Sequence, residues 1–326
     1  MNPYLRPRGS KGVVAMQAYD IICAGEMLID FTSGKEPYTF TANPGGAPAN
    51  VAISTARNGL STAFLGILGN DDFGKRLKGT LEENKVTLLC PDLTDQAITT
   101  LAFVTLYENG ERSFTFARKP GADILLCAGD VKQSDIAACR MFHAGSVSLS
   151  DNPCRDAIKY AMKLAHDAHK IVSFDVNYRD MIWGDMAKCK KEVDSILPYV
   201  DLLKISDEEL YFVGGEDAIP AFMQQYDIRV LIQTLGADGA RYYFRNSSQT
   251  MPGQKVKAVD ATGAGDAFWG GFLSRMLQFG ITGADEITEE MVQTALHYGN
   301  VSGGLCVQKM GGIPAIPDKD AILQAL

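Results

Sequence analysis

A glycine-rich turn with an aspartate directly after it lies late in the chain, at Gly263-Ala264-Gly265-Asp266. Apolar residues then recur at helical spacing over 267–277, which predicts that the turn opens a buried helix. The first N–H groups of a helix lack intrahelical partners and carry partial positive charge, so this end is suited to bind a phosphate. A carboxylate beside an anion site is useful when a substrate hydroxyl lies between the two and gives up its proton. The pattern therefore favours phosphoryl transfer to an alcohol, although a tight turn with a helix-stabilising charge would use the same four residues.

Two longer patterns resemble a known family. The stretch Asp260-x-Thr262-Gly263-Ala264-Gly265-Asp266-x-Phe268 resembles the C-terminal signature of the ribokinase-like (PfkB) carbohydrate kinases. Upstream, Gly45-Gly46-Ala47-Pro48-Ala49-Asn50 resembles the N-terminal sugar-binding signature of that family, and of its fructokinases in particular. The resemblance runs from about residue 20 to the end, with both signatures in the right order. It implies an ATP-dependent sugar kinase, closest to bacterial and plant fructokinases. In such a kinase Asp266 takes the hydroxyl proton, and the N–H groups of Gly263, Ala264 and Gly265 hold the charge of the transferring group.

Candidate sugar-binding residues lie in three places. Gly45 and Gly46 have no side chains and so permit close approach of a ligand to the backbone, and Asn50 follows in the first turns of the next helix. Asp30 interrupts an apolar run and faces either solvent or a ligand. The Asp-x-Asn-x-Arg spacing that ends in Asn177 and Arg179 resembles a segment shared by fructokinases and 2-keto-3-deoxygluconate kinases. That resemblance implies that these two side chains face the sugar and phosphate side of the cleft; a polar loop with helix caps is the alternative.

The nucleotide and metal candidates depend mainly on the resemblance, which implies ATP and Mg²⁺ as cofactors. It implies that the turn containing Thr234, Gly236 and Gly239 lines the ATP cleft, with Asn300 as a weaker candidate on a late helix. It also implies that Glu209 acts on Mg²⁺ through water, although Ser206 stands where the family commonly has asparagine. Ser206 and Glu209 alone would equally form a capping box. Several relatives bind a monovalent cation such as K⁺, and the matching residues here are Asp260 and Thr262.

Other functions remain as alternatives to fructokinase. The nearest is 2-keto-3-deoxygluconate kinase, which needs a cation for the substrate carboxylate, and Arg118 at the end of a predicted hairpin could supply it. Ribokinase is a more distant third. A non-catalytic sugar-binding protein would keep the Gly45–Asn50 face but would not need Asp266 beside an anion site. A nicotinamide dehydrogenase is excluded, because no Gly-x-Gly-x-x-Gly follows the first predicted strand.

The wider pattern predicts an α/β fold with a doubly wound, mostly parallel sheet flanked by helices. Runs typical of buried strands alternate with helical segments from about residue 140 onward, and ligands bind at the C-terminal strand ends of such sheets. Extended segments at about 27–43 and 96–119, the second with its turn at Asn109-Gly110, predict a small β lid. We expect one domain over residues 16–326, preceded at 1–15 by a tag or a disordered leader.

The amino-acid composition indicates which classes of partner and which cellular compartment to expect. The formal net charge of −8 over 326 residues argues against nucleic acid or an anionic membrane as a partner. The seven cysteines include no Cys-x-x-Cys pair, which argues against disulfides or zinc and favours a reducing cytoplasm. No apolar run approaches the length of a transmembrane helix. The expected partners are therefore a small sugar and ATP, and an exposed lid sheet favours a homodimer formed through the lid.

Overall fold

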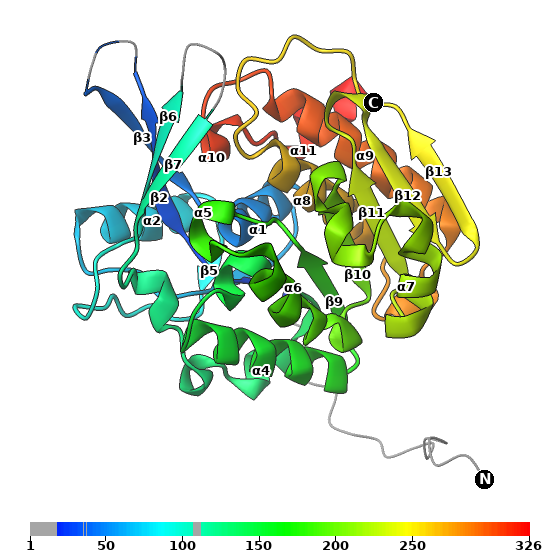
Figure 1. Cartoon of the computed structure of the whole chain (residues 1–326), viewed down its shortest axis with the longest axis horizontal. Helices are drawn as coiled ribbons and strands as arrows, with labels where there is room; N and C mark the ends of the chain where they lie inside the picture. The colour runs from blue at the N-terminus through cyan, green and yellow to red at the C-terminus, as the bar shows by residue number, and fades with distance from the viewer. Residues whose placement is uncertain (1–17, 35, 37, 107–111) are drawn as a thin grey trace.

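A mixed, nine-stranded sheet forms the centre of the residues that the structure, a computed structural model, describes: 18–34, 36, 38–106 and 112–326 (Figure 1). The predicted leader at 1–15 and the predicted turn at Asn109-Gly110 lie outside these residues. The strands are β1 (Tyr19–Ala24), β4 (Thr62–Leu65), β5 (Thr87–Leu88), β8 (Cys139–Gly145), β9 (Ile171–Asp175), β10 (Leu202–Ser206), β11 (Val230–Thr234), β12 (Ala240–Phe244) and β13 (Ser247–Met251).

The order of the strands is β13-β12-β11-β10-β9-β8-β1-β4-β5. All neighbours from β11 to β5 are parallel, whereas β12 and β13 run antiparallel at one edge. The parallel strands are short and apolar because helices cover them on both faces, and every residue of β9 is buried. The predicted doubly wound, mostly parallel α/β fold is therefore confirmed.

Two helical layers bury the two faces of this sheet (Figure 1). One apolar core joins the sheet to α1, α2, α8 and α9, and the other joins it to α4, α6 and α7. The helices are α1 (Ala47–Arg57), α2 (Asp72–Glu83), α3 (Gln133–Ala137), α4 (Cys154–Asp167), α5 (Asp180–Trp183), α6 (Met186–Asp194), α7 (Ile219–Tyr226), α8 (Ala264–Gln278), α9 (Glu289–Cys306), α10 (Gly312–Ala315) and α11 (Lys319–Ala325).

A second sheet of four strands stands beside the main one, at the left of Figure 1. Its strands are β2 (Leu28–Ser33), β3 (Phe40–Gly45), β6 (Leu101–Leu106) and β7 (Arg112–Ala117), in the order β3-β2-β6-β7. We call it the lid sheet. One of its faces carries the aromatic contact of Phe31 with Phe103, whose ring centroids are 5.0 Å apart. Phe31 and Asp30 are neighbours in β2, so their side chains point to opposite faces of the lid sheet.

The sequence interpretation did not predict the two edge strands of the main sheet, β5 and β13. The polar residues 246–248 are typical of a turn, but β13 begins at Ser247 and pairs with β12 over five residues, from Ser247 opposite Phe244 to Met251 opposite Ala240. The polar run from Ser247 to Thr250 lacks the apolar alternation of a half-buried strand, because β13 is an edge strand with little to bury.

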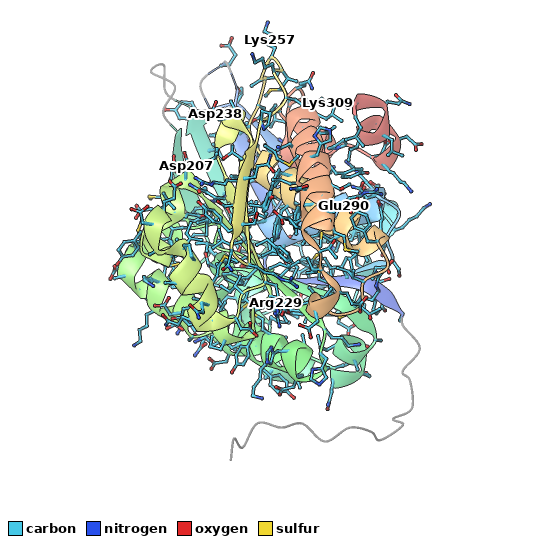
Figure 2. All side chains as sticks on the ribbon, turned by 90° about the vertical axis from the view of Figure 1, so that its right-hand side faces the viewer. Asp207, Arg229, Asp238, Lys257, Glu290 and Lys309 are labelled. Atoms are coloured by element: carbon cyan, nitrogen blue, oxygen red, sulfur yellow. The ribbon has the colours of Figure 1, made fainter. Side chains whose placement is uncertain are left out.

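The C-terminal ends of the parallel strands share one end of the molecule. In Figure 2, Asp207 and Asp238 lie near the upper end, whereas Arg229, directly before β11, lies well below them. The segments that follow β9, β10 and β11 therefore meet at the upper end. Among the described residues, no helix combines the length and the apolarity that crossing a membrane requires.

Candidate active site

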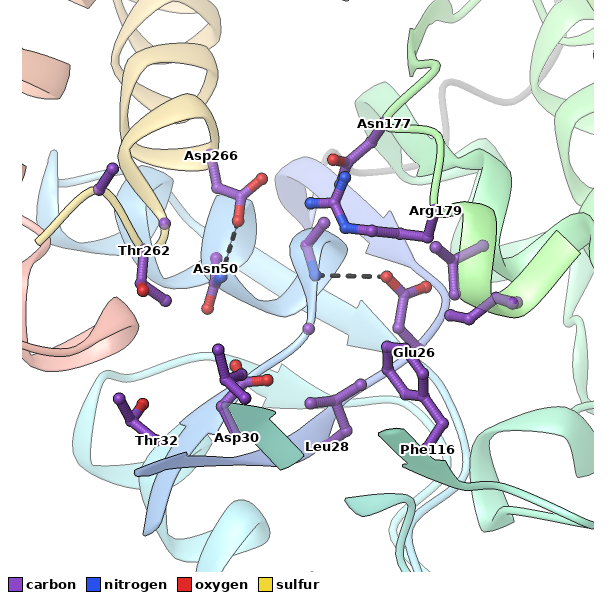
Figure 3. Close-up of a pocket in the computed structure, with 17 residues that line it drawn as sticks. Glu26, Leu28, Asp30, Thr32, Asn50, Phe116, Asn177, Arg179, Thr262 and Asp266 are labelled. Carbon is purple, nitrogen blue, oxygen red and sulfur yellow. Dashed lines mark hydrogen bonds between the residues drawn. The ribbon is translucent and has the colours of Figure 1, made fainter. Parts of the chain in front are cut away.

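A cavity of about 330 Å³ lies between the lid sheet and the C-terminal ends of the main strands (Figure 3). Leu28, Asp30 and Thr32 of β2 line it from the lid side. The segment after β9 and the first turn of α8 line it from the main body. Residues from both predicted signatures therefore meet here, together with the Asp-x-Asn-x-Arg segment; those that line the cavity are Asp30, Gly46, Asn50, Asn177, Arg179, Thr262, Gly263 and Asp266.

Asp266 lies in the first turn of α8, as the glycine-rich pattern predicts, and its side chain reaches the cavity. The Nδ2 of Asn50, in α1, donates a hydrogen bond of 2.7 Å to Asp266 Oδ2 (Figure 3). The side-chain oxygen of Asn50, Oδ1, is buried and has no partner among the described residues. A buried acceptor without a partner is costly, so this atom suits the hydroxyl donor of a ligand.

The turn before α8 presents backbone donors to the same cavity. Gly263 adopts a left-handed conformation with φ 75°, which favours glycine, and it is the N-cap of the helix. Within the described residues, the N–H groups of Gly263, Gly265 and Asp266 donate no hydrogen bond. The N–H group of Ala264 is already used, because it donates to the carbonyl oxygen of Ala261 at 3.2 Å. The anion site suggested by the sequence thus has donors at Gly263, Gly265 and Asp266, with Ala264 engaged inside the turn.

The surroundings of Asp266 raise its proton affinity. Burial raises the pKa of its carboxyl group to about 6 from an ordinary value near 3.8. The hydrogen bond from Asn50 opposes this rise, the negative charge of Asp175 adds to it, and the positive charges of Lys204 and Arg179 oppose it. A carboxylate with a pKa of about 6 is mostly ionised at neutral pH and can still accept a proton, which suits a general base.

The pKa of Asp266 predicts how activity depends on pH. A general base must be unprotonated, so kcat/KM should be near its plateau above pH 7 and fall about tenfold for each pH unit well below pH 6. Initial rates between pH 4.5 and 9, with circular dichroism at each pH to verify folding, check this. A plateau that continues to pH 4.5 in folded protein would contradict the assignment.

Asp30 faces Asp266 across the cavity (Figure 3). Burial raises the pKa of Asp30 to about 7, and the negative charge of Asp266 contributes to the rise, whereas Arg179 lowers it. Gly45 leaves room for the Asp30 carboxylate in this position, because a Cβ on Gly45 would displace it. Gly46 has φ 106°, and a Cβ there would lie 2.5 Å from the carbonyl oxygen of Glu26. The two glycines therefore allow β3 and α1 to pack against this wall of the cavity.

Asn177 and Arg179 enter the cavity from the loop that follows β9. Asn177 has φ 39°, and Arg179 is solvent-exposed, with one terminal nitrogen donating to the carbonyl oxygen of Tyr178 at 2.9 Å. Figure 3 shows the Arg179 guanidinium on the side of the cavity where Asp266 and Asn50 lie. Arg179 is thus a cation within reach of a ligand in the cavity.

The nucleotide-side candidates do not line this cavity. Thr234 ends β11, and Gly236 and Gly239 form the turn into β12, at the same end of the sheet. The Asn300 amide donates to the carbonyl oxygens of Met251 and Pro252, at 3.2 and 3.3 Å. Asn300 therefore holds the segment that leaves β13.

The residues predicted to bind cations already accept hydrogen bonds from backbone N–H groups. Glu209 is buried, and its two oxygens accept N–H groups from Tyr178 and Ser206, the second as part of the predicted capping box. Asp260 accepts the N–H and the hydroxyl of Thr262, and also the N–H of Gly311 at 2.9 Å. Among the described residues, no group of three or more His, Cys, Asp or Glu side chains could hold a metal ion.

The structure adds Glu26, which the sequence interpretation did not consider, and it argues against Arg118, which that interpretation considered as a substrate ligand. Glu26, two residues after the end of β1, lines the cavity, accepts the N–H of Ala47 and accepts the hydroxyl of Ser148 at 2.7 Å. A carboxylate one residue after a glycine that ends a buried strand is the signal that could have identified it. Arg118 does not line the cavity; its guanidinium is buried and paired with Asp123, with 2.6 Å between the nitrogen and Oδ2. Arg118 is therefore already neutralised and is poorly placed to bind a substrate carboxylate.

Comparison with known proteins identifies the family. Residues 16–319 match the sequence profile of the pfkB family carbohydrate kinases. "Probable fructokinase-7" of Arabidopsis thaliana is 38% identical over 322 residues, which cover 94% of this chain and 92% of that protein. The crystal structure of a fructokinase with bound ATP from Xylella fastidiosa superposes with a TM-score of 0.85 at 32% identity, covering 94% of this chain and 97% of that one. A fructokinase double mutant from Vibrio cholerae O395, in a form with bound fructose, ADP and potassium ion, has a TM-score of 0.83 at 28% identity, covering 95% and 99%. Because the family match spans most of the sequence, this chain belongs to the pfkB family of carbohydrate kinases.

Proposed function

We propose that the protein is an ATP-dependent fructokinase that converts fructose and ATP to fructose 6-phosphate and ADP. The observation that carries the proposal is the meeting of Asp266 and the start of α8 in one cavity, opposite Asp30. The N–H groups of Gly263 and Asp266 there have no partner among the described residues. A carboxylate next to an electropositive helix end suits a reaction in which an alcohol is deprotonated while negative charge moves through a phosphoryl group. The relatives named as fructokinases support fructose as the sugar.

Each of these residues has a separate role in the proposed phosphoryl transfer. Asp266 accepts the proton of the 6-hydroxyl group as that oxygen forms its bond to the γ-phosphorus and the bond from this phosphorus to the β–γ bridging oxygen breaks. The N–H groups of Gly263, Gly265 and Asp266 stabilise the charge on the transferring group, a role in which each donor typically contributes about 3 kcal/mol. Asp30, Gly46 and Asn50 orient the sugar through its other hydroxyl groups. Arg179 adds positive charge where the phosphoryl group passes.

The residues present also fit the nucleotide and its metal. Three N–H groups at the start of α8 have no partner in the part of the chain that the structure describes and suit a phosphate, and the turn of Thr234, Gly236 and Gly239 lies at the same end of the sheet. Glu209 is a buried carboxylate just after β10, at this end of the sheet, and it could hold Mg²⁺ through its water. When bound, Mg²⁺ would neutralise charge on the phosphates of ATP.

Two further features belong to the same proposal. Potassium bound in the Vibrio cholerae fructokinase supports a monovalent cation near Asp260 and Thr262, which anchor the loop before α8. A homodimer through the lid would cover the lid face that carries Phe31 and Phe103, opposite the face that carries Asp30.

A substrate panel tests the proposal. ADP release from MgATP should be measured with fructose, ribose, 2-keto-3-deoxygluconate and nucleosides, and phosphorus NMR should identify the product. We expect kcat/KM for fructose to exceed the others by about 10-fold or more, because buried polar groups reject sugars that leave them unpaired. Preference for 2-keto-3-deoxygluconate would contradict the proposal, as would ATP hydrolysis without phosphorylation of any sugar.

A further inference from the structure

A buried ion pair lies behind the first turn of α8, outside the sugar cavity. Lys204 in β10 and Asp175 at the end of β9 are direct partners in the register of the two parallel strands. The Lys204 Nζ donates to Asp175 Oδ2 at 2.7 Å, and the two side chains are only 6% and 2% exposed. Partners on adjacent parallel strands project to the same face. On this face Ser173, two residues before Asp175, accepts the indole N–H of Trp269 in α8 at 3.1 Å.

The pair lies directly below the predicted anion site. A Cβ built on Gly265 would be 3.7 Å from Lys204 Nζ, which places the ammonium group against the turn that carries the free N–H groups. A lysine ammonium has three N–H donors, and within the described residues Lys204 uses one hydrogen bond, to Asp175. Asp175 also has unused capacity, because its Oδ1 has no hydrogen-bond partner in the described chain.

A contribution to the stability of the folded protein does not explain this buried ion pair. Burying two charges costs desolvation energy that their attraction only partly offsets, and apolar or neutral replacements of whole pairs are often neutral or stabilising. Unfilled hydrogen-bonding capacity adds to the cost. A buried, under-satisfied pair against the end of a helix therefore calls for an explanation from function.

We propose that Lys204 and Asp175 form a positioning pair for phosphoryl transfer, in which Lys204 holds a fixed positive charge beneath the α8 turn and Asp175 keeps it there. This inference depends on the proposed kinase function. Positive charge behind the turn strengthens the donors at Gly263 and Gly265 in a region that excludes water, and so stabilises the charge of the transferring group. It also helps Asp266 to remain ionised when substrate is absent.

Several titratable groups surround this centre. Those that interact with Asp266, with Lys204 or with both are Asp30 from β2, His143 from β8, Asp175 from β9, Arg179 after β9, Lys204 from β10, Glu209 after β10 and Cys306 from α9. Asp175 raises the pKa of Asp266 and Lys204 lowers it, so the two members of the pair act on the base in opposite directions. The carboxylates around Lys204, Asp175 first, outweigh its burial and raise its pKa, which keeps the ammonium charged at neutral pH.

The test compares Lys204→Met, Asp175→Asn and the neutral double variant with the wild type. In the double variant no charge is left buried without its partner, so we expect its Tm to stay close to that of the wild type. Its kcat should fall about 10-fold or more while the KM for fructose changes little. The matched control is Lys159→Met with Glu192→Gln, which neutralises a pair of 2.6 Å remote from the cavity and should leave kcat unchanged. A folded Lys204/Asp175 double variant with wild-type kcat would overturn the inference.

Carbon NMR of the Asp266 carboxyl group, assigned by its loss in Asp266→Asn, gives a readout that does not depend on activity. Its pKa should rise in Lys204→Met, fall in Asp175→Asn and return close to the wild-type value in the double variant. Nitrogen NMR of the wild type should find Lys204 as an ammonium at pH 7.5, and a neutral amine would overturn the inference whether or not any variant folds. A wild type that phosphorylates no sugar would instead refute the kinase proposal, and the NMR results would still decide the charge of the pair.

Discussion

Asp266→Asn is expected to lower turnover by about 10²-fold or more while fructose and MgATP still bind. The amide cannot accept the hydroxyl proton, but it keeps the shape of the carboxyl group and can still accept the hydrogen bond from Asn50. The effect should therefore appear in kcat, with KM for both substrates within a few fold of the wild type. Stopped assays of ADP release, with calorimetry for binding, measure the two parts separately. Near-wild-type turnover would show that Asp266 is not the base.

The Asp266→Asn change should not lower the stability of the folded protein. The pKa of Asp266 in the folded protein, about 6, is above its ordinary value, so the ionised carboxylate costs stability as the pH rises through 6. Replacement by a neutral amide removes that cost, and the Tm at pH 8 should equal or exceed that of the wild type. Below about pH 4, where Asp266 is protonated in both the folded and the unfolded wild type, the Tm values of the two proteins should become equal. Asp201→Asn is the matched control, because burial also raises the pKa of Asp201 to about 6 and its carboxylate accepts only the Val172 N–H among the described residues, far from the cavity. Its turnover should remain close to the wild type.

Gly263→Ala is expected to lower kcat by about 10²-fold, because it disturbs the donors that hold the transferring group. Gly263 has φ 75°, and a Cβ there would lie 3.1 Å from the Cα of Gly312, so the turn must shift. An alanine in a left-handed conformation also costs about 1–2 kcal/mol of stability. Steady-state kinetics and thermal unfolding of the variant give both quantities.

Gly280→Ala is the control for that change. Gly280 follows the other end of α8 with φ 84°, and a Cβ there would meet no atom within 4 Å. The control should lose a similar amount of stability and keep its turnover. If both variants keep wild-type kcat, the turn before α8 is not the anion site.

The main residues of the site could be predicted from the sequence because they lie in short, contiguous motifs. The glycine turn and Asp266 lie next to each other in the chain, and the Gly45-Gly46 turn leads directly into the helix that carries Asn50. The contact between Asn50 and Asp266 joins residues 216 positions apart, so only the fold brings the two signatures together. Their meeting could be expected only from the resemblance to a known family.

Other features had no local signal. Glu26 and Lys204 each follow or interrupt a buried strand, where a charged residue is ordinary at the sequence level. Their importance comes from what lies across the sheet end: Ser148 and Ala47 for the first, Asp175 and the α8 turn for the second. Arg118 was considered as a substrate ligand because its later partner, Asp123, could not be identified before the chain was folded. The strand β13 was missed because an edge strand needs no apolar pattern.

A crystal structure of Asp266→Asn with fructose and a non-hydrolysable MgATP analogue tests the central claim most directly. We expect the 6-hydroxyl oxygen to lie within hydrogen-bond distance, about 3 Å, of the side chain at position 266. We also expect the γ-phosphoryl group to lie against the N–H groups of Gly263 and Gly265. A sugar bound with its 6-hydroxyl group away from position 266, or a γ-phosphoryl group away from the α8 turn, would contradict it.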